Sequence, residues 1–285
     1  MTSFRRAALF PALALAALGV LLPGPGWADV GHPASVPGKA AGVARDAGRA
    51  GTACDAARAM ATGDAARAGV ARDAGRSGAL TVVHRGPARG RRVALTFDDC
   101  GDSAAWSSIL TTLRRARTHA TFFPIGRNTV AHPDLARRMV AAAHDVGNHS
   151  WSHVLLTSMS YEDAVSELRA ADAALLLVTG RRPGPFLRPP FGRWSRALAA
   201  AAADAGCRYI VKWDVDGRDW KGAAAARIVA RVLGRAGPGS IVALHTCRQT
   251  AAALPAILEG LRSRGLRPVT LHQLLGLKRG AGTAG

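Results

Sequence analysis

The stretch VALTFDDCG, Val93 to Gly101, decides the fold class of this 285-residue chain. Val93 to Phe97 is a short apolar run, which is typical of a buried strand. Two carboxylates, Asp98 and Asp99, follow it directly. A helical pattern begins soon afterwards, with large apolar side chains recurring from Trp106 to Leu113. A buried strand that ends in acidic residues and leads into a helix is the first unit of a predicted α/β fold.

Strand and helix patterns alternate from this unit towards the C-terminus. Ser160 and Asp163 form a predicted capping box for a long helix that Gly180 ends. We expect strands at 93–97, 120–123, 208–213, 240–245 and 267–269, and helices at 106–113, 133–147, 160–180, 195–205, 223–235 and up to 265. This order predicts parallel strands with helices outside, as a barrel or as an open sheet. In both architectures the active site lies at the carboxyl ends of the strands.

The first ninety residues have a different character. A positive start, an apolar run over 7–22 and small residues ahead of Ala28 predict a signal peptide over 1–28. An uncleaved anchor is the alternative, but the run is short for a bilayer span. Residues 29–90 are rich in Ala, Gly and Arg, which predicts a flexible linker. We therefore expect a secreted or wall-associated protein with its folded domain over 91–277 and a flexible tail over 278–285.

Composition limits the possible partners. Hydrophobic residues make up 48% of the chain, enough for a sizeable core, and the formal net charge is +19. This charge favours anionic surfaces, but no nucleic-acid motif is present, so we expect no nucleic-acid partner. The excess is almost all arginine, and it reflects either compositional bias or electrostatic association with an anionic cell wall. The four cysteines do not have zinc-finger spacing.

Two motifs offer metal ligands. Asp98 and Asp99 at a strand end can reach one pocket, where a divalent metal takes one carboxylate and leaves the other free as a base. The segment GNHSWSH, 147–153, places His149 and His153 one turn apart if it is helical. Two imidazoles and one carboxylate form a catalytic zinc set with an open position for water. The alternatives are turn-forming aspartates and a surface histidine pair.

Three further motifs offer catalytic groups. Arg188, in FLRPPFG, is placed to pair with a buried carboxylate such as Asp98; the alternative is a solvated arginine in a Pro-rich loop. In WDVDGRDW, Trp220 offers a flat apolar wall and Asp219 can orient a neighbour; the alternative is a core tryptophan beside a turn. In IVALHTC, His245 at a strand end is a natural proton donor; the alternative is a structural histidine.

The segments TFDD, HSWSH, RPPFG, DGRDW and LHT, in this order, resemble the five motifs of the polysaccharide deacetylase family, also called carbohydrate esterase family 4 or the NodB homology domain. The resemblance covers about 91–275. It implies a distorted (β/α) barrel that removes N- or O-acetyl groups from a carbohydrate polymer with a metal ion. It also implies the residue roles: Asp98 as base, His245 as acid, Arg188 as the residue that orients the base, Asp99, His149 and His153 as metal ligands, and Phe191, Trp220 and Leu244 as substrate contacts.

The expected cofactor and substrate follow from this resemblance. Zinc is favoured by the ligand type, and cobalt or nickel can substitute. The first expected substrate is wall peptidoglycan, while chitin-like glycans and acetylated xylan stay open. The enzyme is expected to be a monomer. Two other classes also stay open: a metal-dependent amidohydrolase acting on a small non-sugar amide, and a non-catalytic protein that binds wall glycan.

The chain departs from the family pattern at three positions. Cys100 stands where the family usually has glycine, and Phe191 stands where it often has tyrosine. Ala226 lies near the point where many relatives of the family place an aspartate that supports the catalytic histidine. We therefore expect the pKa of His245 to differ from that of the relatives' histidine. Cys100 and Cys247 flank the first and last motifs, which are neighbours in a closed barrel, and we expect a disulfide between them at the rim.

Overall fold

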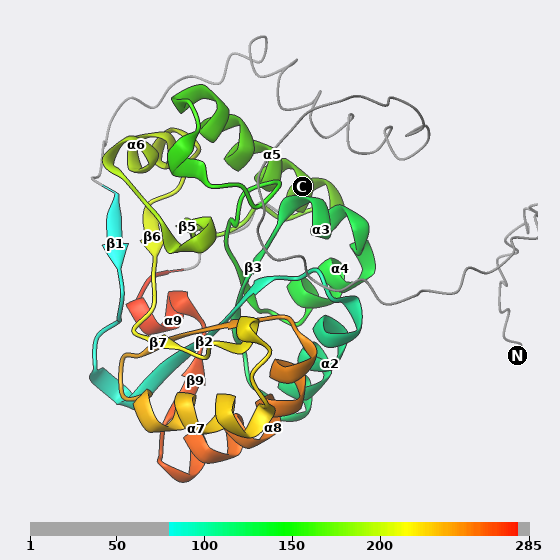
Figure 1. Cartoon of the computed structure of the whole chain (residues 1–285), viewed down its shortest axis with the longest axis vertical. Coiled ribbons are helices and arrows are strands. Elements are labelled where there is room, and N and C mark those ends of the chain that lie inside the picture. The colour runs from blue at the N-terminus through cyan, green and yellow to red at the C-terminus, as the bar shows by residue number, and fades with distance from the viewer. Residues whose placement is uncertain (1–79, 279–285) are drawn as a thin grey trace, which may run out of the picture. The chain divides into compact units, whose positions relative to one another are not determined.

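The computed structural model describes residues 80–278 (Figure 1). The expected signal peptide at 1–28, residues 29–79 of the expected linker and residues 279–285 of the tail lie outside this range. The folded part starts earlier than expected, because strand β1 (Thr81–Val83) falls inside the segment assigned to the linker. Within residues 80–278, every helix is too short or too polar to cross a membrane.

The strands form two parallel sheets, as the alternation of strands and helices in the sequence predicts. The larger sheet has the order β4-β3-β2-β8-β7, and β9 pairs with the first residues of β2. The smaller sheet has the order β1-β6-β5. The strands of the larger sheet are β2 (Arg92–Asp99), β3 (Thr121–Pro124), β4 (Asp145–Val146), β7 (Val215–Asp216), β8 (Ile241–His245) and β9 (Arg267–Val269), and β5 (Phe186–Leu187) and β6 (Tyr209–Val211) join β1 in the smaller one.

Two isolated bridges link these sheets. A parallel bridge between Asn148 and Leu187 joins the β4 edge to β5. An antiparallel bridge between Arg85 and Ser240 joins the segment after β1 to the residue before β8. The strands therefore follow one another around an irregular ring, which confirms the expected distorted (β/α) barrel.

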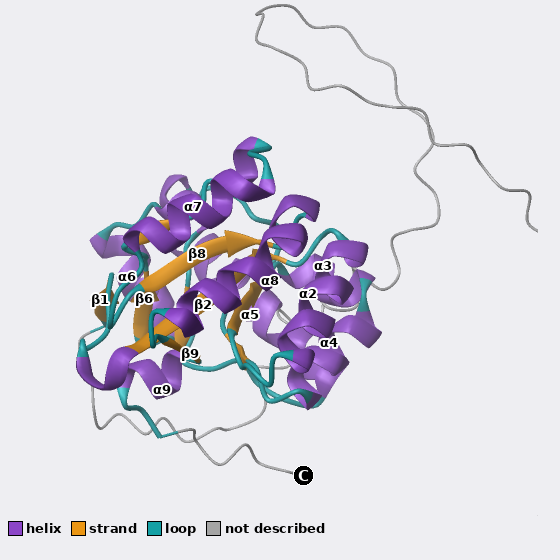
Figure 2. Cartoon of the chain, turned by 90° about the horizontal axis from the view of Figure 1, so that it is seen from below, coloured by secondary structure: helices purple, strands orange, loops and turns teal. Residues whose placement is uncertain are grey.

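Helices lie outside the strands (Figure 1, Figure 2). Four of them begin with a polar cap whose side chain accepts a hydrogen bond from a backbone N–H of the first turn: Asp102, Ser160, Ser195 and Thr270. The helices are α2 (Ser103–Arg115), α3 (Gly126–Ala131), α4 (Pro133–Ala141), α5 (Tyr161–Thr179), α6 (Arg196–Asp204), α7 (Ala225–Arg235), α8 (Arg248–Ser263) and α9 (Leu271–Leu275), with 3-10 turns η1 (Arg89–Arg91), η2 (Leu156–Ser158), η3 (Pro190–Gly192) and η4 (Asp219–Lys221).

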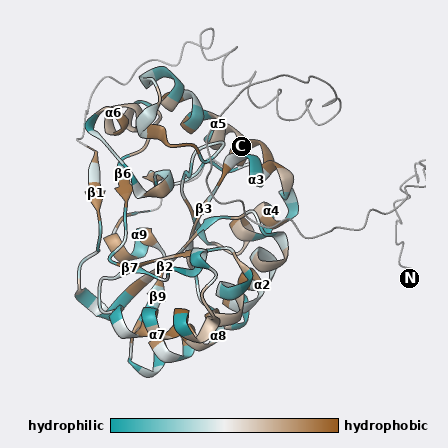
Figure 3. Ribbon diagram, in the orientation of Figure 1, coloured by the Kyte–Doolittle hydropathy of each residue, from teal (hydrophilic) through white to brown (hydrophobic). Residues whose placement is uncertain are grey.

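Side chains of β2 alternate between two apolar layers. Leu95 and Phe97 belong to the layer between the larger sheet and its helices, whereas Ala94 belongs to a cluster with Phe123 and Phe186. Hydropathy follows this division, with apolar residues concentrated on strands and polar residues on outer helix faces (Figure 3). The face of β2 that carries Ala94 ends in Asp98, so the strand's alternation aims this carboxylate away from the helix layer.

One predicted helix is shorter than expected. Helix α4 ends at Ala141 and not at Gly147, and Ala143 has a φ of 56°. Asp145 and Val146 then pair with β3 as a strand of two residues. A left-handed residue stops the helix and turns the chain back to the sheet, which brings the histidine motif to the carboxyl ends of the strands.

Candidate metal centre and active site

The candidate base and acid lie on neighbouring strands. Asp98 at the end of β2 and His245 at the end of β8 are partners in the parallel register. Asp98 is only 4% exposed. Parallel strands end on the same edge of a sheet, so this pairing alone brings two residues that are far apart in sequence into one site.

Arg188 forms the expected pair with Asp98. The arginine is fully buried, and its Nη1 lies 2.8 Å from Asp98 Oδ1 and 2.7 Å from Thr96 Oγ1. The guanidinium carbon sits 4.4 Å from the centre of the Phe123 ring. Its remaining nitrogens donate to the carbonyl oxygens of Val211 and Lys212. A buried charge needs this degree of pairing, and the result fixes the Asp98 carboxylate in one orientation.

Three candidate metal ligands converge next to this pair. Asp99 Oδ1 lies 3.4 Å from His149 Nε2 and 3.6 Å from His153 Nε2. One ligand atom from each residue lies within 4.8 Å of the others. His149 Nδ1 is 2.6 Å from the Arg188 carbonyl oxygen. An Nδ1–H that donates to this oxygen leaves Nε2 as a lone-pair donor facing Asp99, which is how proteins orient metal-binding histidines.

The residues fit a divalent metal ion. Asp99 Oδ1 is buried and has no hydrogen-bond partner among the described residues, although two imidazole nitrogens flank it. Burial alone would raise the pKa of Asp99, but His149, His245 and His153 together lower it. Burial and the neighbouring His149 lower the pKa of His153. An ionised carboxylate and neutral imidazoles are the forms that coordinate a metal, and this donor set suits zinc.

The histidine motif is a loop and not the helix that the spacing suggested. Ser150 and His153 both have a φ of 61°, which no right-handed helix contains. The rings of His149 and His153 are still close, with centroids 5.0 Å apart. The loop therefore brings the two imidazoles together without a shared helix face.

Helix α5 holds this loop in place. The Asn148 side chain donates to the Leu168 carbonyl oxygen at 2.8 Å and to Asp172 Oδ1 at 2.6 Å. The Glu167 carboxylate accepts hydrogen bonds from the backbone N–H and the hydroxyl of Ser152. Burial raises the pKa of Asp172 to about 6. Side chains of one helix thus replace the regular hydrogen bonds that the loop lacks.

His245 is held by Asp219, which is 1% exposed. Asp219 Oδ1 lies 2.8 Å from His245 Nδ1, and Oδ2 accepts the backbone N–H of His245 at 2.6 Å. The backbone N–H of Trp220 donates to Oδ1 at 3.0 Å, and the Thr250 hydroxyl donates to Oδ2. With Nδ1 engaged, Nε2 of His245 is left for proton transfer. The carboxylate that supports His245 thus precedes Trp220 in sequence and does not lie near Ala226.

This environment keeps the candidate acid protonated. Burial alone would lower the pKa of His245, but Asp219, Asp98 and Asp99 outweigh it and raise the pKa to about 9. Asp219 itself stays ionised, because His245 and Thr250 lower its pKa against the effect of burial. His245 therefore carries a proton at neutral pH, which is the form that a general acid needs.

The three expected substrate contacts do not share one environment. Phe191 is 63% exposed and Trp220 is 59% exposed. The Phe191 ring lies 4.8 Å from the His153 ring, centroid to centroid, beside the metal ligands. Leu244 is fully buried in the layer between sheet and helices, on the face of β8 opposite His245. Ala243, not Leu244, shares the strand face of His245, and the role of Leu244 in a substrate pocket stays a prediction.

The expected disulfide is absent. Cys100, Cys207 and Cys247 are free thiols. Cys100 is fully buried in the outer core, whereas the Cys247 sulfur lies 3.3 Å from Thr250 Oγ1. The two thiols thus have different surroundings. Cys100 has a φ of 55°, a conformation that favours glycine, so the backbone is strained at this residue.

A parallel barrel with an Asp–His–His cluster, a buried Asp–Arg pair and a carboxylate-held histidine defines a candidate metal-dependent site on a (β/α) scaffold. The chain belongs to the polysaccharide deacetylase family, whose model matches residues 85–210. It is 35% identical over 188 residues to a peptidoglycan-N-acetylmuramic acid deacetylase of Bacillus subtilis, covering 66% of this chain and 39% of that protein. The chain therefore matches about two fifths of that relative's length.

Two other similarities bear on the site. A chitooligosaccharide deacetylase of Bradyrhizobium is 35% identical over 199 residues, covering 65% of this chain and 90% of that protein. The crystal structure of a carbohydrate esterase family 4 pseudoenzyme from Bacillus anthracis matches with a TM-score of 0.66 and 26% identity, covering 71% of each chain. The same fold thus occurs in a protein described as a pseudoenzyme, so activity has to be argued from the site residues.

Proposed function

We propose that this protein is an exported, metal-dependent hydrolase that removes acetyl groups from the amino sugars of a carbohydrate polymer, with wall peptidoglycan as the first substrate class. One observation carries the proposal: Asp99, His149 and His153 lie together beside a buried Asp98–Arg188 pair and a His245 whose Nδ1 is held by Asp219. Relatives named as peptidoglycan and chitooligosaccharide deacetylases support the substrate class.

The residues divide the reaction among them. Asp99, His149 and His153 would hold a divalent ion, which when bound would supply a Lewis acid for the acetyl carbonyl and would lower the pKa of a water molecule. Asp98, held by Arg188, accepts the proton of the attacking water. The backbone N–H at Phe191, beside His153, is the proposed protein donor to the developing oxyanion. His245 then donates its proton to the leaving amine, which otherwise departs poorly.

The location and substrate rest on the sequence. The expected signal peptide and the net charge of +19 favour a place outside the cytoplasmic membrane, next to an anionic wall. Chitin-like oligomers and acetylated xylan are the alternative polymers; an ester needs the acid His245 less than an amide does. A role as a non-catalytic glycan-binding protein is the competing class, and the complete set of site residues favours catalysis.

Acetate release tests this function. Zinc-loaded protein is incubated with peptidoglycan, acetylated glucosamine oligomers and a small non-sugar amide, and acetate is measured. We expect release from a glycan, its loss after chelation and its return with zinc. Asp98→Asn should lower kcat by about a hundredfold to ten-thousandfold, the usual contribution of a general base. Asp134→Asn, on the exposed face of α4, is the matched control and should keep activity.

Two results would contradict the proposal. Unchanged turnover in Asp98→Asn would remove the assigned base, and release from the small amide alone would favour the amidohydrolase. Zinc binding measured by calorimetry separates the roles: Asp99→Asn should weaken it, whereas Asp98→Asn should leave it nearly intact.

A further inference from the structure

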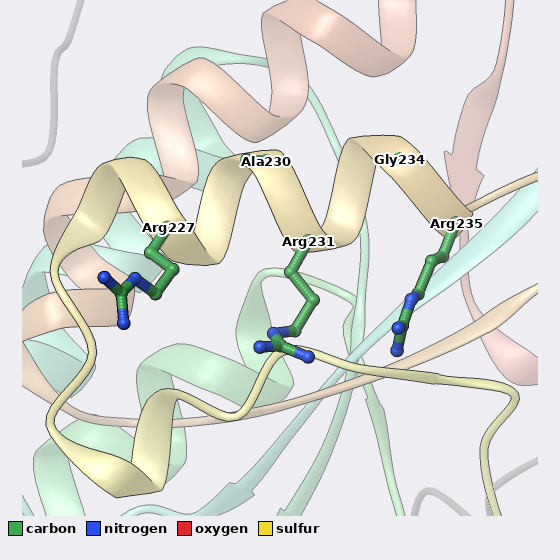
Figure 4. A pocket seen from close by; sticks show the side chains of 5 residues that line it. All are labelled: Arg227, Ala230, Arg231, Gly234 and Arg235. Carbon is green, nitrogen blue, oxygen red and sulfur yellow. The ribbon is translucent and has the colours of Figure 1, made fainter.

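The outer face of α7 carries a row of arginines that the proposed reaction does not use. Arg227, Arg231 and Arg235 are spaced four residues apart, so each step along the helix is about 6 Å. Their side chains project from the same side of the helix (Figure 4). Ile228 and Val232, each one residue after an arginine, are buried in the core, so the arginine row runs along the edge between the exposed and the buried side of α7.

Small residues separate the arginines and leave room between them. The three arginines, Ala230 and Gly234 line a shallow hollow of about 360 Å³. A side chain added at Gly234 would meet nothing within 4 Å, so packing does not demand glycine there. Glycine inside a helix lowers the stability of the helix. The lack of a side chain at Gly234 leaves the hollow open.

Nothing in the described part of the chain neutralises this row. Helix α7 contains no acidic residue, and none of the ion pairs found within residues 80–278 involves these arginines. Among the acidic groups of adjoining elements, Glu259 of α8 pairs with Arg262 and Asp216 of β7 pairs with Arg218. Like charges four residues apart destabilise an isolated helix, so the row has an energetic cost that an anionic ligand would offset.

We propose that the α7 arginine row binds a linear polymer of phosphodiester groups. Guanidinium groups recognise phosphate oxygens in pairs, and a straight open row suits a chain of anions better than one small anion. The hollow contains no large apolar residue that would insert into a bilayer and no aromatic residue on which bases would stack. A phosphodiester polymer of the cell wall matches these features.

The row is also placed to serve the candidate site. Helix α7 begins shortly after η4, which carries Trp220, and leads to β8, which carries His245. A polymer bound along α7 anchors the protein on the anionic wall beside its glycan. The binding does not depend on catalysis, so Asp98→Asn should bind the polymer as the natural chain does.

The test measures binding of the full chain to a fluorescent synthetic poly(glycerol phosphate) across a range of salt concentrations. The variant Arg227→Gln/Arg231→Gln/Arg235→Gln should bind about tenfold more weakly or worse, and its slope of log affinity against log salt should fall by about two to three. The control Arg114→Gln/Arg115→Gln/Arg117→Gln removes the same charge from exposed positions at the end of α2 and should have a smaller effect. Both variants should release acetate from a neutral oligomer at the natural rate.

Three outcomes would overturn the proposal. Equal losses in the two variants would mean that binding follows total charge and not α7. A natural chain that does not bind the polymer would remove the site. Binding to phosphatidylglycerol-containing vesicles, without binding to the soluble polymer, would assign the row to a membrane surface. Circular dichroism of each variant confirms that it is folded.

Discussion

Asp219 joins three segments at one carboxylate. Its oxygens accept hydrogen bonds from His245 on β8, Trp220 on η4 and Thr250 on α8. Such a carboxylate sets the tautomer and orientation of the histidine and raises its proton affinity. Asp219 therefore raises the pKa of His245 together with Asp98 and Asp99, although Asp219 itself touches no reacting atom.

Replacing Asp219 should change the pH profile more than the fold of the site. In Asp219→Asn the hydrogen bond to Nδ1 persists in part, but the negative charge that raises the pKa of His245 is gone. A general acid works only below its pKa, so the alkaline limb of kcat/KM should move to lower pH. Rates measured across the pH range for the natural chain and the variant test this. An unmoved limb would mean that His245 is not the titrating acid.

Backbone strain gathers at the same residues. Asp99, Cys100, His153 and Phe191 all have positive φ, between 55° and 73°. Residues other than glycine adopt this backbone conformation at an energetic cost, and they persist in it where the surrounding structure holds them. Two of the three candidate metal ligands, Asp99 and His153, are therefore placed by backbone geometry as well as by side-chain contacts.

At the scale of elements, long segments were predictable and short ones were not. Apolar runs gave β2 and β8, and caps gave both ends of α5. Strands of two residues, such as β4 and β7, have no period to detect. The spacing of the histidine motif matches one helical turn and so could not distinguish a helix from a loop, while the partners that hold the loop lie on α5, fifteen or more residues away.

The site shows the same limit. Motif order placed Asp98, Asp99 and the two histidines in one region, because each motif ends or follows a strand. Leu244 follows from the family resemblance alone: alternation along β8 turns a residue next to His245 the other way, into the core cluster. The contact between Asp219 and His245 spans 26 positions, and no local pattern predicts it.

The junction between β1 and β8 gives a test of the ring. Gly239 has a φ of 88°, and a side chain there would lie 2.5 Å from the Gly86 carbonyl oxygen. Gly239→Ala should therefore destabilise the protein by about 2 kcal/mol or more, because it adds a backbone clash to the strain of a left-handed residue. Gly222→Ala, at a φ of 69° with open space around it, should cost only about 1 kcal/mol from the strain. Equal losses in chemical denaturation would contradict this account.

At the scale of the whole molecule, His245 couples folding to pH. In the metal-free protein its folded pKa is about 9, above the ordinary value of 6.5. A raised pKa stabilises the folded state fully below the unfolded pKa, and this contribution is lost as pH rises through the folded pKa. The charges that face His245 are those of Asp219, Asp98 and Asp99.

The difference in unfolding free energy between the natural chain and His245→Gln measures this contribution. With metal removed, the difference should be largest near pH 6 and should shrink as the pH approaches 9. Denaturation curves at several pH values give the result. A difference that stays constant across this range would show that His245 keeps an ordinary pKa in the folded protein.

The Arg188–Asp98 pair has a consequence for biosynthesis. The two residues are 90 positions apart, and the three candidate metal ligands are all complete by His153, before the arginine has been translated. A nascent chain thus carries its chelating groups while its base still lacks a counter-ion, and the proton donor His245 emerges last. Premature termination would leave a fragment that holds the chelating residues without the rest of the machinery, so turnover is a strict reporter of a full-length, ring-closed product.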